Sequence, residues 1–464
     1  MDSILRGYHV NNPTWLYLSF LLILAVYFKF SRVWSVRNLD VLLLLSISPG
    51  LLLVGDDLQP GVVSFGYVWL FAVSTLLLAR VLYDGLITRR PRLEQNMNAA
   101  GMAFLCLSTF LFLTVKLLTE APPASTVESI RQANELMEGG GPQGEVRVAG
   151  DTSTKSEPGA ETAPTGPGTS LAAVSVAQLS KVVAPRDLSQ GPSVTDLDVV
   201  TARLIAIFAH LAVIAGLTLV GRHIFADPDL GFAMAALYML LPCTAFDVGQ
   251  ITHVLPAAFI VWAILAYRRP FVSGTLRGLA CAMMFFPVFL LPLWAAFYGR
   301  RGALRFGVAV GLTAIVIVSS LALLSGDSQT FVRQLRPDVL QFLAGGSTSG
   351  FWGKYEPAYR VPVFVTYVVM LVALTIWPRQ KSLAHVITHS AAIVIGTQFW
   401  YPEQGGVYVL WYLPLLLLVL FRPLMTNHLA PEFKPLDLRS RLGLRERKQP
   451  ALMAAETAGA GHIP

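Results

Sequence analysis

Charged residues are scarce in this chain: they make up 14% of its 464 residues, whereas a typical soluble domain carries roughly 25%. Hydrophobic residues account for 54%, and they cluster in runs of about 17–24 residues. A bilayer core about 30 Å thick needs about 20 helical residues to cross it. The sequence therefore predicts an all-α, polytopic transmembrane protein. It argues against a soluble enzyme, a secreted disulfide scaffold and a nucleic-acid-binding protein.

Cysteine is also scarce, and familiar cofactor motifs are missing. Cys106, Cys243 and Cys281 each lie inside an apolar run and show no metal-ligand spacing. The chain has no Walker A sequence, no CxxCH haem motif and no GxSxG elbow. No cofactor is indicated. A divalent metal would be compatible with an acidic pair described below, but nothing in the sequence calls for one.

The apolar runs predict twelve membrane-embedded segments. They lie near residues 13–30, 39–54, 62–83, 98–118, 198–221, 229–246, 251–267, 278–297, 303–324, 361–377, 383–398 and 406–424. The first run has no basic leader and no small-residue cleavage site before it, so we expect it to remain as a membrane helix.

The net charge of +7 arises from basic residues at the ends of these runs, and their distribution predicts the orientation. The connections 29–38 and 80–94 are basic and should be cytoplasmic, whereas 55–61 is acidic and should lie outside. The segment 278–297 has basic residues on both sides and contains two prolines, so we expect a broken, re-entrant helix there. About eleven full crossings remain, with the C-terminus inside.

Two stretches interrupt the apolar pattern and divide the chain. Residues 119–197 are rich in Pro, Gly, Ser and Thr, and we expect a disordered extracytoplasmic loop. Residues 425–464 should form a flexible basic cytoplasmic tail. The remaining parts, 1–118 and 198–424, are predicted to be an N-terminal and a C-terminal group of transmembrane helices.

Two groups of polar residues at the predicted outer face can carry chemistry. Asp56 and Asp57 form an acidic pair that can act as a general base on an acceptor hydroxyl, or form a solvated turn before Pro60. Asp247, Gln250 and His253 stand where an outer connection enters a helix. Gln250 and His253 share a helical face and can position a polar substrate, while interfacial capping by Asp247 is the alternative.

Two outer aromatic stretches suggest substrate contacts as well. In residues 347–360, Trp352 and Tyr355 offer faces for sugar rings, and Lys354 and Arg360 can neutralise a phosphate. The stretch 399–412 is again aromatic and adds Glu403. An aromatic belt at the membrane interface is the alternative for both.

Three histidines lie inside the predicted spans. They are His210, His385 and His389. Ionisable residues within a membrane point to function, although neutral histidine also hydrogen-bonds between helices.

Residues 198–310 resemble a known family. Gly249-Gln250 opens one helix, and Gly278, Ala280, Ala282 and Pro287 follow between basic flanks. This order resembles the polyprenol-phosphate-sugar-dependent glycosyltransferases of the GT-C superfamily, especially the DUF2029 (GT87) group. That group carries a lysine where this chain has Met284.

The resemblance implies an integral membrane glycosyltransferase of a bacterial-type inner membrane. It would move a mannose-like hexose from a polyprenyl-phosphate donor to an extracytoplasmic acceptor, with Asp56 or Asp57 as base. The expected partners are that lipid and membrane lipids, and no nucleic acid. Pro-broken helices also suit a transporter or a lipid or polysaccharide translocase, and the methionine suits a catalytically inactive relative.

Overall fold

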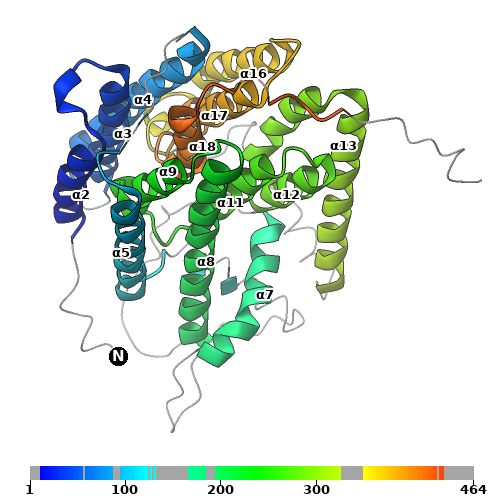
Figure 1. Ribbon diagram of the computed structural model, residues 1–464. Helices are drawn as coiled ribbons and strands as arrows, with labels where there is room; N and C mark the ends of the chain where they lie inside the picture. The colour runs from blue at the N-terminus through cyan, green and yellow to red at the C-terminus, as the bar shows by residue number, and fades with distance from the viewer. Residues whose placement is uncertain are drawn as a thin grey trace, which may run out of the picture. The chain divides into compact units, whose positions relative to one another are not determined.

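The computed structural model describes most of the apolar part of the chain (Figure 1). The described residues are 11–55, 58–86, 93, 95–123, 126–127, 130–131, 166–183, 194–324, 349–425 and 428–432. Within them the regular structure is helical, apart from one β-bridge between Ser382 and Leu429. The predicted all-α class is confirmed.

The N-terminal helices follow the predicted spans closely. They are α2 (Asn12–Tyr27), α3 (Val36–Leu52), α4 (Pro60–Leu82), the 3₁₀ turn η3 (Tyr83–Leu86) and α5 (Ala99–Thr119). Their starts have clear local causes. The side chains of Asn11, Ser35 and Asn98 each accept a hydrogen bond from a backbone N–H of the first turn. Pro60 opens α4 at a position where no backbone donor is needed.

From residue 167 onward the helices vary widely in length. They are α7 (Pro167–Val183), α8 (Val194–His223), α9 (Pro228–Leu240), α10 (Pro242–Phe246), α11 (Ile251–Leu265), α12 (Pro270–Met283), η4 (Phe286–Leu290), α13 (Leu291–Leu324), η5 (Trp352–Lys354), η6 (Pro357–Tyr359), α16 (Arg360–Ile376), α17 (Leu383–Trp400) and α18 (Val409–Phe421).

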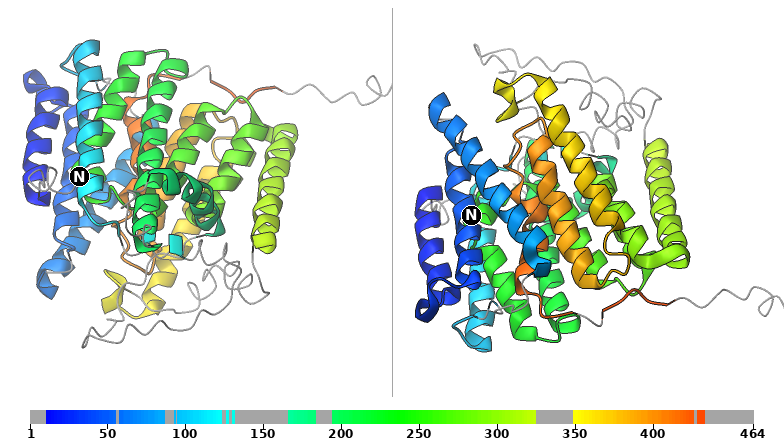
Figure 2. Two further views of the ribbon diagram at one scale, coloured as in Figure 1. Left: turned by 90° about the horizontal axis from the view of Figure 1, so that it is seen from below. Right: turned by 90° about the horizontal axis from the view of Figure 1, so that it is seen from above.

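The most apolar short helix, α18, lies at the centre of the packed helices. Every residue of α18 is buried, and it contacts α9, α11 and α17. Helix α17 packs between α4 and α16, as the right panel of Figure 2 shows. Helix α16 instead turns a stripe of valines outward at helical spacing, including Val361, Val365 and Val369. An outward apolar stripe on a peripheral helix is expected where the neighbour is lipid.

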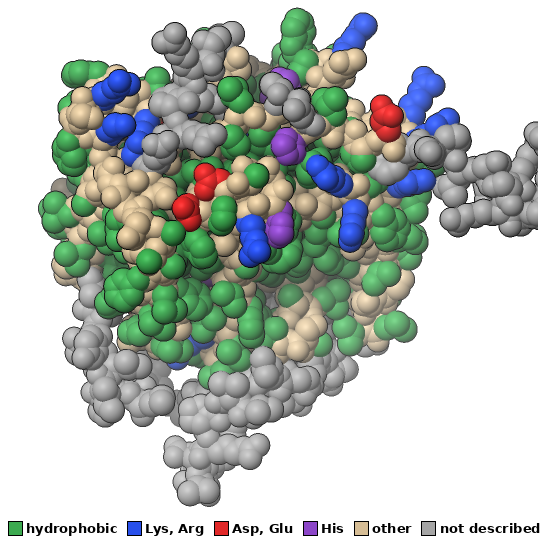
Figure 3. Space-filling model, viewed as in Figure 1, with side chains coloured by type: hydrophobic (Ala, Val, Ile, Leu, Met, Phe, Trp, Pro, Cys, Tyr) green, Lys and Arg blue, Asp and Glu red, His purple; other side chains and the backbone are tan. Residues whose placement is uncertain are grey.

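Among the described residues, five helices are long and apolar enough to cross a bilayer, including α4, α5 and α16. Figure 3 shows Lys, Arg and His side chains gathered at the upper end of the view, above a flank that is mainly hydrophobic. This distribution is the one expected at a water-facing end of a membrane protein. Together with the apolar helices it agrees with a polytopic membrane fold.

The predicted break in 278–297 is confirmed. Helix α12 ends at Met283, the next residue Met284 is extended, and a 3₁₀ turn containing Pro287 leads into α13. Proline has no N–H to donate, so a continuous helix is disfavoured there. Helix α13 then bends at Gly299, whose φ of 62° is left-handed. Both the break and the bend lie between the two basic clusters that suggested a re-entrant segment.

Two predicted segments differ from the structure. The single span expected at 229–246 is divided, because Leu241 is extended and Pro242 begins α10. Within 119–197, where we expected disorder, residues 167–183 form α7, which packs against α8 and α12. The amide of Gly166 donates to the carbonyl of Met283 at 2.9 Å. The small residues that suggested disorder therefore permit close contact with α12. The residues 425–464 lie outside the described residues except 425 and 428–432.

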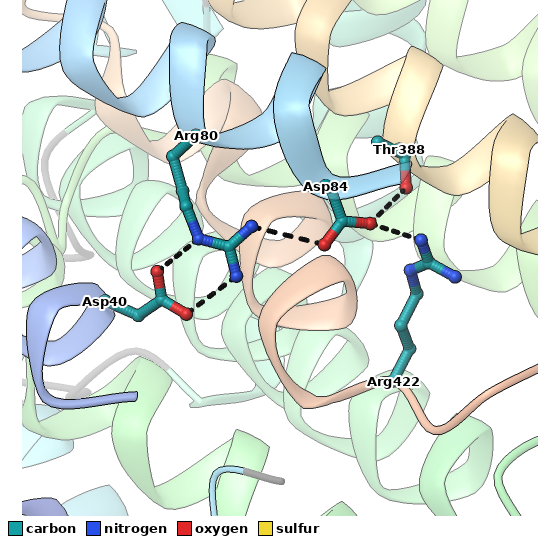
Figure 4. Close-up of polar contacts among 5 residues, drawn as sticks. All are labelled: Asp40, Arg80, Asp84, Thr388 and Arg422. Atoms are coloured by element: carbon teal, nitrogen blue, oxygen red, sulfur yellow. Dashed lines mark hydrogen bonds and ion pairs between the residues drawn. The ribbon is translucent and has the colours of Figure 1, made fainter. Parts of the chain in front are cut away.

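A chain of buried ion pairs joins distant parts of the sequence (Figure 4). Arg80 binds Asp40 through two hydrogen bonds of 2.6 and 2.9 Å, and it binds Asp84 at 3.2 Å. Arg422 donates to the other carboxylate oxygen of Asp84, which also accepts from Thr388 at 3.5 Å. The side chain of Asp84 is only 1% exposed, and that of Arg422 is 8% exposed. The network ties α3, the end of α4, α17 and the end of α18 together.

Replacing Gly299 with alanine is expected to lower the free energy of unfolding by about 1–2 kcal/mol. A Cβ at this position would meet nothing within 4 Å, so the cost comes from the left-handed backbone alone. Unfolding of purified protein in detergent would measure it. Gly307 is the matched control, since it lies in the same helix with equal space and without a left-handed φ. Equal losses in the two variants would contradict the assignment of a strained bend.

Candidate functional site

Three segments that are far apart in sequence meet at one end of α11 and α18. They are the start of α11, the segment 349–360 and the loop 401–408. Ser349 donates its amide to Pro402 at 3.1 Å, and the amide of Gln404 donates to Ser349 Oγ at 3.3 Å. The ring of Tyr408 then contacts His253 on α11. These contacts join the three segments in which most of the predicted site residues occur.

His253 is enclosed by aromatic rings. Its imidazole meets the edge of Tyr408 at 5.1 Å and the ring of Trp411 at 6.0 Å between centroids. Tyr408 and Trp411 stack on each other at 4.3 Å. His253 is buried, and its Nδ1 has no hydrogen-bond partner among the described residues. An imidazole of this kind can still donate to or accept from a polar ligand.

The aromatic cluster continues into the break after α12. Phe286 stacks on Trp411 at 4.7 Å, and Phe285 stacks on Tyr401 at 5.2 Å. Tyr401 also meets Tyr408 at 5.1 Å. The sequence analysis singled out the aromatic composition of 399–412 but did not foresee that Phe285 and Phe286 join it. Both rings lie in the break itself, directly after the extended Met284.

The turn between α10 and α11 carries Asp247 and Gln250. Asp247 does not cap α11, because Gln250 occupies the N-cap position. The preceding carbonyl, that of Val248, lies 3.0 Å from Nε2 of His210, and the Tyr238 hydroxyl lies 3.0 Å from Nδ1 of the same ring. The carbonyl must accept, so Nε2 carries the proton and Nδ1 accepts from the tyrosine. His210 is therefore a hydrogen-bonding residue between helices, and it holds the turn that displays Asp247.

The other predicted histidines also make local or interhelical hydrogen bonds. His385 completes the capping box of Ser382 at the start of α17. Nδ1 of His389 lies 3.0 Å from the carbonyl oxygen of Leu374 on α16. Neither of these two histidines takes part in the contacts that define the candidate site.

The carboxyl group of Asp247, in the turn between α10 and α11, lies in an unusual environment. Its Oδ2 is buried and has no hydrogen-bond partner among the described residues. Burial raises the pKa of Asp247 to about 7. A carboxyl with a pKa near neutrality can exchange a proton or accept hydrogen bonds from sugar hydroxyls under physiological conditions.

The segment 349–360 holds the predicted cationic and aromatic residues against the neighbouring helices. Trp352 donates from Nε1 to the carbonyl of Phe399 at 3.0 Å and is buried. Lys354 hydrogen-bonds Ser64 in the first turns of α4. Tyr355 is about half exposed and packs on Phe351. Arg360 begins α16 and is buried.

Glu403 lies in the loop between α17 and α18. It interacts electrostatically with Tyr401 and Tyr408, so it belongs to the aromatic cluster that surrounds His253. Asp56 and Asp57 lie outside the described residues. The helices on either side of them are described: α3 ends at Leu52, and α4 begins at Pro60, four residues before the serine that binds Lys354.

No group of three His, Cys, Asp or Glu side chains suited to a metal occurs in the part of the chain that the structure describes. The residues able to bind a ligand are instead aromatic, amide, imidazole and single carboxyl groups.

Asparagine at position 247 should alter how stability depends on pH. The folded protein keeps the Asp247 proton up to about pH 7, whereas an unfolded chain releases it near pH 4. The folded state binds more protons in this interval, so the wild-type contribution to stability falls as the pH rises. The unfolding temperature of Asp247→Asn, measured relative to that of wild type, should therefore be higher at pH 8 than at pH 5.

Thermal unfolding in detergent at the two pH values would measure this difference. Asp229→Asn, at an exposed position of α9, is the matched control and should show the same difference at both. A pH-independent effect of Asp247→Asn would contradict the raised pKa.

Comparison with known families confirms the resemblance seen in the sequence. The model of Glycosyltransferase family 87 matches residues 195–400. The matched region contains Asp247, Gln250 and His253, the segment 349–360 and the break after α12, and it ends just before the loop that carries Glu403. No curated protein and no solved structure gives a match. The family match and the apolar helices support an integral membrane glycosyltransferase.

Proposed function

Taking residues 195–400 as a glycosyltransferase family 87 region, we propose that the chain transfers a hexose, mannose or a close analogue, from a polyprenyl-phosphate donor to an extracytoplasmic acceptor. The membrane would be a bacterial-type inner membrane, and the site would face its outer side. The carrying observation is the aromatic cluster around His253, which is built at the Gly249-Gln250 end of α11, within the family match.

The cluster has the composition expected for binding a sugar. Trp411 is stacked between Tyr408 and Phe286, so the rings form the wall of the cluster, while His253, Asp247 and Glu403 supply polar atoms for the hydroxyls of a sugar. Two such polar atoms, Nδ1 of His253 and Oδ2 of Asp247, lack partners among the described residues. Buried polar atoms without partners are costly, and a bound polyol would satisfy them.

The cations of the segment 349–360 are placed to neutralise the donor phosphate. Lys354 lies against the first turns of α4, and Arg360 lies at the first position of α16. The positive ends of two helix dipoles therefore add to two positive side chains. We assign phosphate binding to these residues, with Trp352 and Tyr355 as neighbouring aromatic contacts.

The base for the acceptor is Asp56 or Asp57 in this proposal. The carboxylate takes the proton of the acceptor hydroxyl, the oxygen attacks the anomeric carbon, and the bond to the phosphate oxygen breaks. The polyprenyl phosphate leaves with the electron pair of that bond. The connection that holds both aspartates leads directly into α4, whose Ser64 contacts Lys354, so base and phosphate-binding cation are linked by one short segment.

Sugar transfer in reconstituted membranes tests the proposal. The purified chain would be supplied with radiolabelled polyprenyl-phosphate mannose and polyprenyl-phosphate glucose, together with a lipid extract as acceptor source. We expect transfer of label from one donor, and equal transfer by the Asp229→Asn control. Folded protein that transfers label from neither donor would contradict the proposal. It would favour an inactive relative with the buried Met284, or a translocase, which flux of labelled lipid across the same membranes would reveal.

A further inference from the structure

A buried arginine on α12 lacks hydrogen-bond partners. The side chain of Arg277 is fully buried, and none of its three guanidinium nitrogens has a partner among the described residues. Its guanidinium carbon lies 3.7 Å from the centroid of the Trp294 ring. The stacked ring contacts the flat face of the guanidinium. Hydrogen bonds leave this group at its edges, so the ring satisfies none of them.

Two hydroxyl groups are also buried next to Arg277. Ser273 lies one helical turn before Arg277 on α12, and Tyr298 lies one turn after Trp294 on α13. Tyr298 is close enough to Arg277 and to Ser273 to interact with both. Both hydroxyl oxygens are buried, and neither makes a hydrogen bond of standard geometry to a described residue, although the two hydroxyls lie close to each other. Three donor side chains therefore converge from facing helices, and no aspartate or glutamate among the described residues forms an ion pair with Arg277.

Such a cluster is costly unless an anion completes it. Burying a cation without a partner is unfavourable, and burying a hydroxyl without a well-formed hydrogen bond adds to the cost. The planar fork of a guanidinium matches the oxygen pair of a phosphate, and two hydroxyls can bind the remaining oxygens. We propose that Arg277, Ser273 and Tyr298 form a binding site for a phosphate group, either that of an isoprenyl phosphate or free phosphate.

The segment that covers Arg277 can move to let a phosphate group reach it. Trp294 and Tyr298 lie on the short first part of α13, between the 3₁₀ turn η4 and the bend at Gly299. Both ends of the segment are therefore irregular, and Gly299 tolerates backbone angles that other residues do not. Helix α12 itself is held in place, because Gly274 and Gly278 lie in tight contact with Phe306 and Thr313 of the second part of α13. A ligand would therefore reach Arg277 through movement of the first part of α13, which carries Trp294 and Tyr298.

This site is distinct from the residues assigned to sugar transfer. It shares none of them, although α12 packs against α11 and the break after α12 brings Phe285 and Phe286 against Tyr401 and Trp411. The inference therefore does not rest on the proposed glycosyl transfer.

Equilibrium binding to the full chain tests the inference. The protein would be placed in nanodiscs of uncharged lipid, and binding of radiolabelled inorganic phosphate and of a short isoprenyl phosphate would be measured separately. We expect saturable binding of at least one probe and at least a tenfold loss of affinity in Arg277→Met. Arg277→Lys, which keeps the charge without the fork, should lose less. Arg300→Met changes an exposed arginine of α13 and should bind like wild type.

The pattern of binding identifies the source of the phosphate. Binding of the isoprenyl phosphate alone assigns the site to a lipid, and binding of both assigns it to the phosphate group itself. Binding of neither probe to wild type, or equal binding by Arg277→Met, would overturn the inference. If Arg277→Met does not fold, the double variant Ser273→Ala/Tyr298→Phe should show a tenfold loss, and undiminished binding by it would be equally decisive. Sugar transfer by the same samples is scored separately, so the two proposals can fail independently.

Discussion

Replacing Asp84 with alanine is expected to lower the free energy of unfolding by about 3–5 kcal/mol. This carboxylate accepts from Arg80 and Arg422 and is almost completely buried. Its loss leaves Arg422 without this ion pair at a buried position, and it leaves Arg80 only Asp40 in the network of Figure 4. A cation that loses its partner inside the protein keeps its desolvation cost but not the attraction that offset it.

Unfolding of the purified protein in detergent would measure this loss. Asp229→Ala is the matched control, since that aspartate is exposed, and we expect a change below about 1 kcal/mol. The double variant Asp84→Leu/Arg422→Met should recover part of the stability, because it removes a charge of each sign together. A loss in Asp84→Ala no larger than in the control would show that the network contributes little.

The second large effect concerns the acidic pair before α4. Asparagine at position 56 or 57 is expected to lower the rate of sugar transfer at saturating donor by 10²–10⁴-fold, because a general base contributes about that much. Asparagine keeps the size of the side chain and cannot take a proton. The two single variants, assayed with the donor that wild type uses, would show which aspartate is the base.

Asp229→Asn is again the matched control, and its rate of sugar transfer should equal that of wild type. The unfolding temperature of each variant should stay near that of wild type, so that a lost rate reports chemistry rather than folding. Wild-type rates in both Asp56→Asn and Asp57→Asn would remove these residues from the mechanism. The phosphate-binding and sugar-binding assignments would then need another base, and Asp247 would be the next residue to substitute.

Most helices could be predicted from the sequence because their apolar runs have clear ends. The break after α12 was also predictable, since Pro287 and the basic flanks are local features. Helix α7 was missed because its small residues are typical of disorder, and only the structure shows that they pack against α8 and α12. The division at Leu241–Pro242 was missed because both sides of it are apolar.

The candidate site was predicted as separate stretches, and the structure joins them. Sequence spacing alone relates Gln250 to His253, but it cannot show that Tyr408 and Trp411 lie against that histidine. The role of His210 was likewise hidden, because its partner is a backbone carbonyl 38 residues away. Arg277 was counted only as one of the basic flanking residues, although it is fully buried. Long-range contacts of this kind leave no periodic signal.

The short length of two central helices has a consequence for the depth at which substrates meet. Helix α11 has 15 residues and α18 has 13, so they are roughly 22 and 20 Å long, against a hydrocarbon core of about 30 Å. Both end near basic residues of the predicted cytoplasmic side, Arg268 and Arg422, and both begin at the aromatic cluster. Their first turns would therefore lie several ångströms below the outer edge of the hydrocarbon. A lipid-borne donor could reach that level without lifting its chain out of the bilayer, whereas a water-soluble acceptor would have to descend to it, which favours acceptors that are themselves anchored in the membrane.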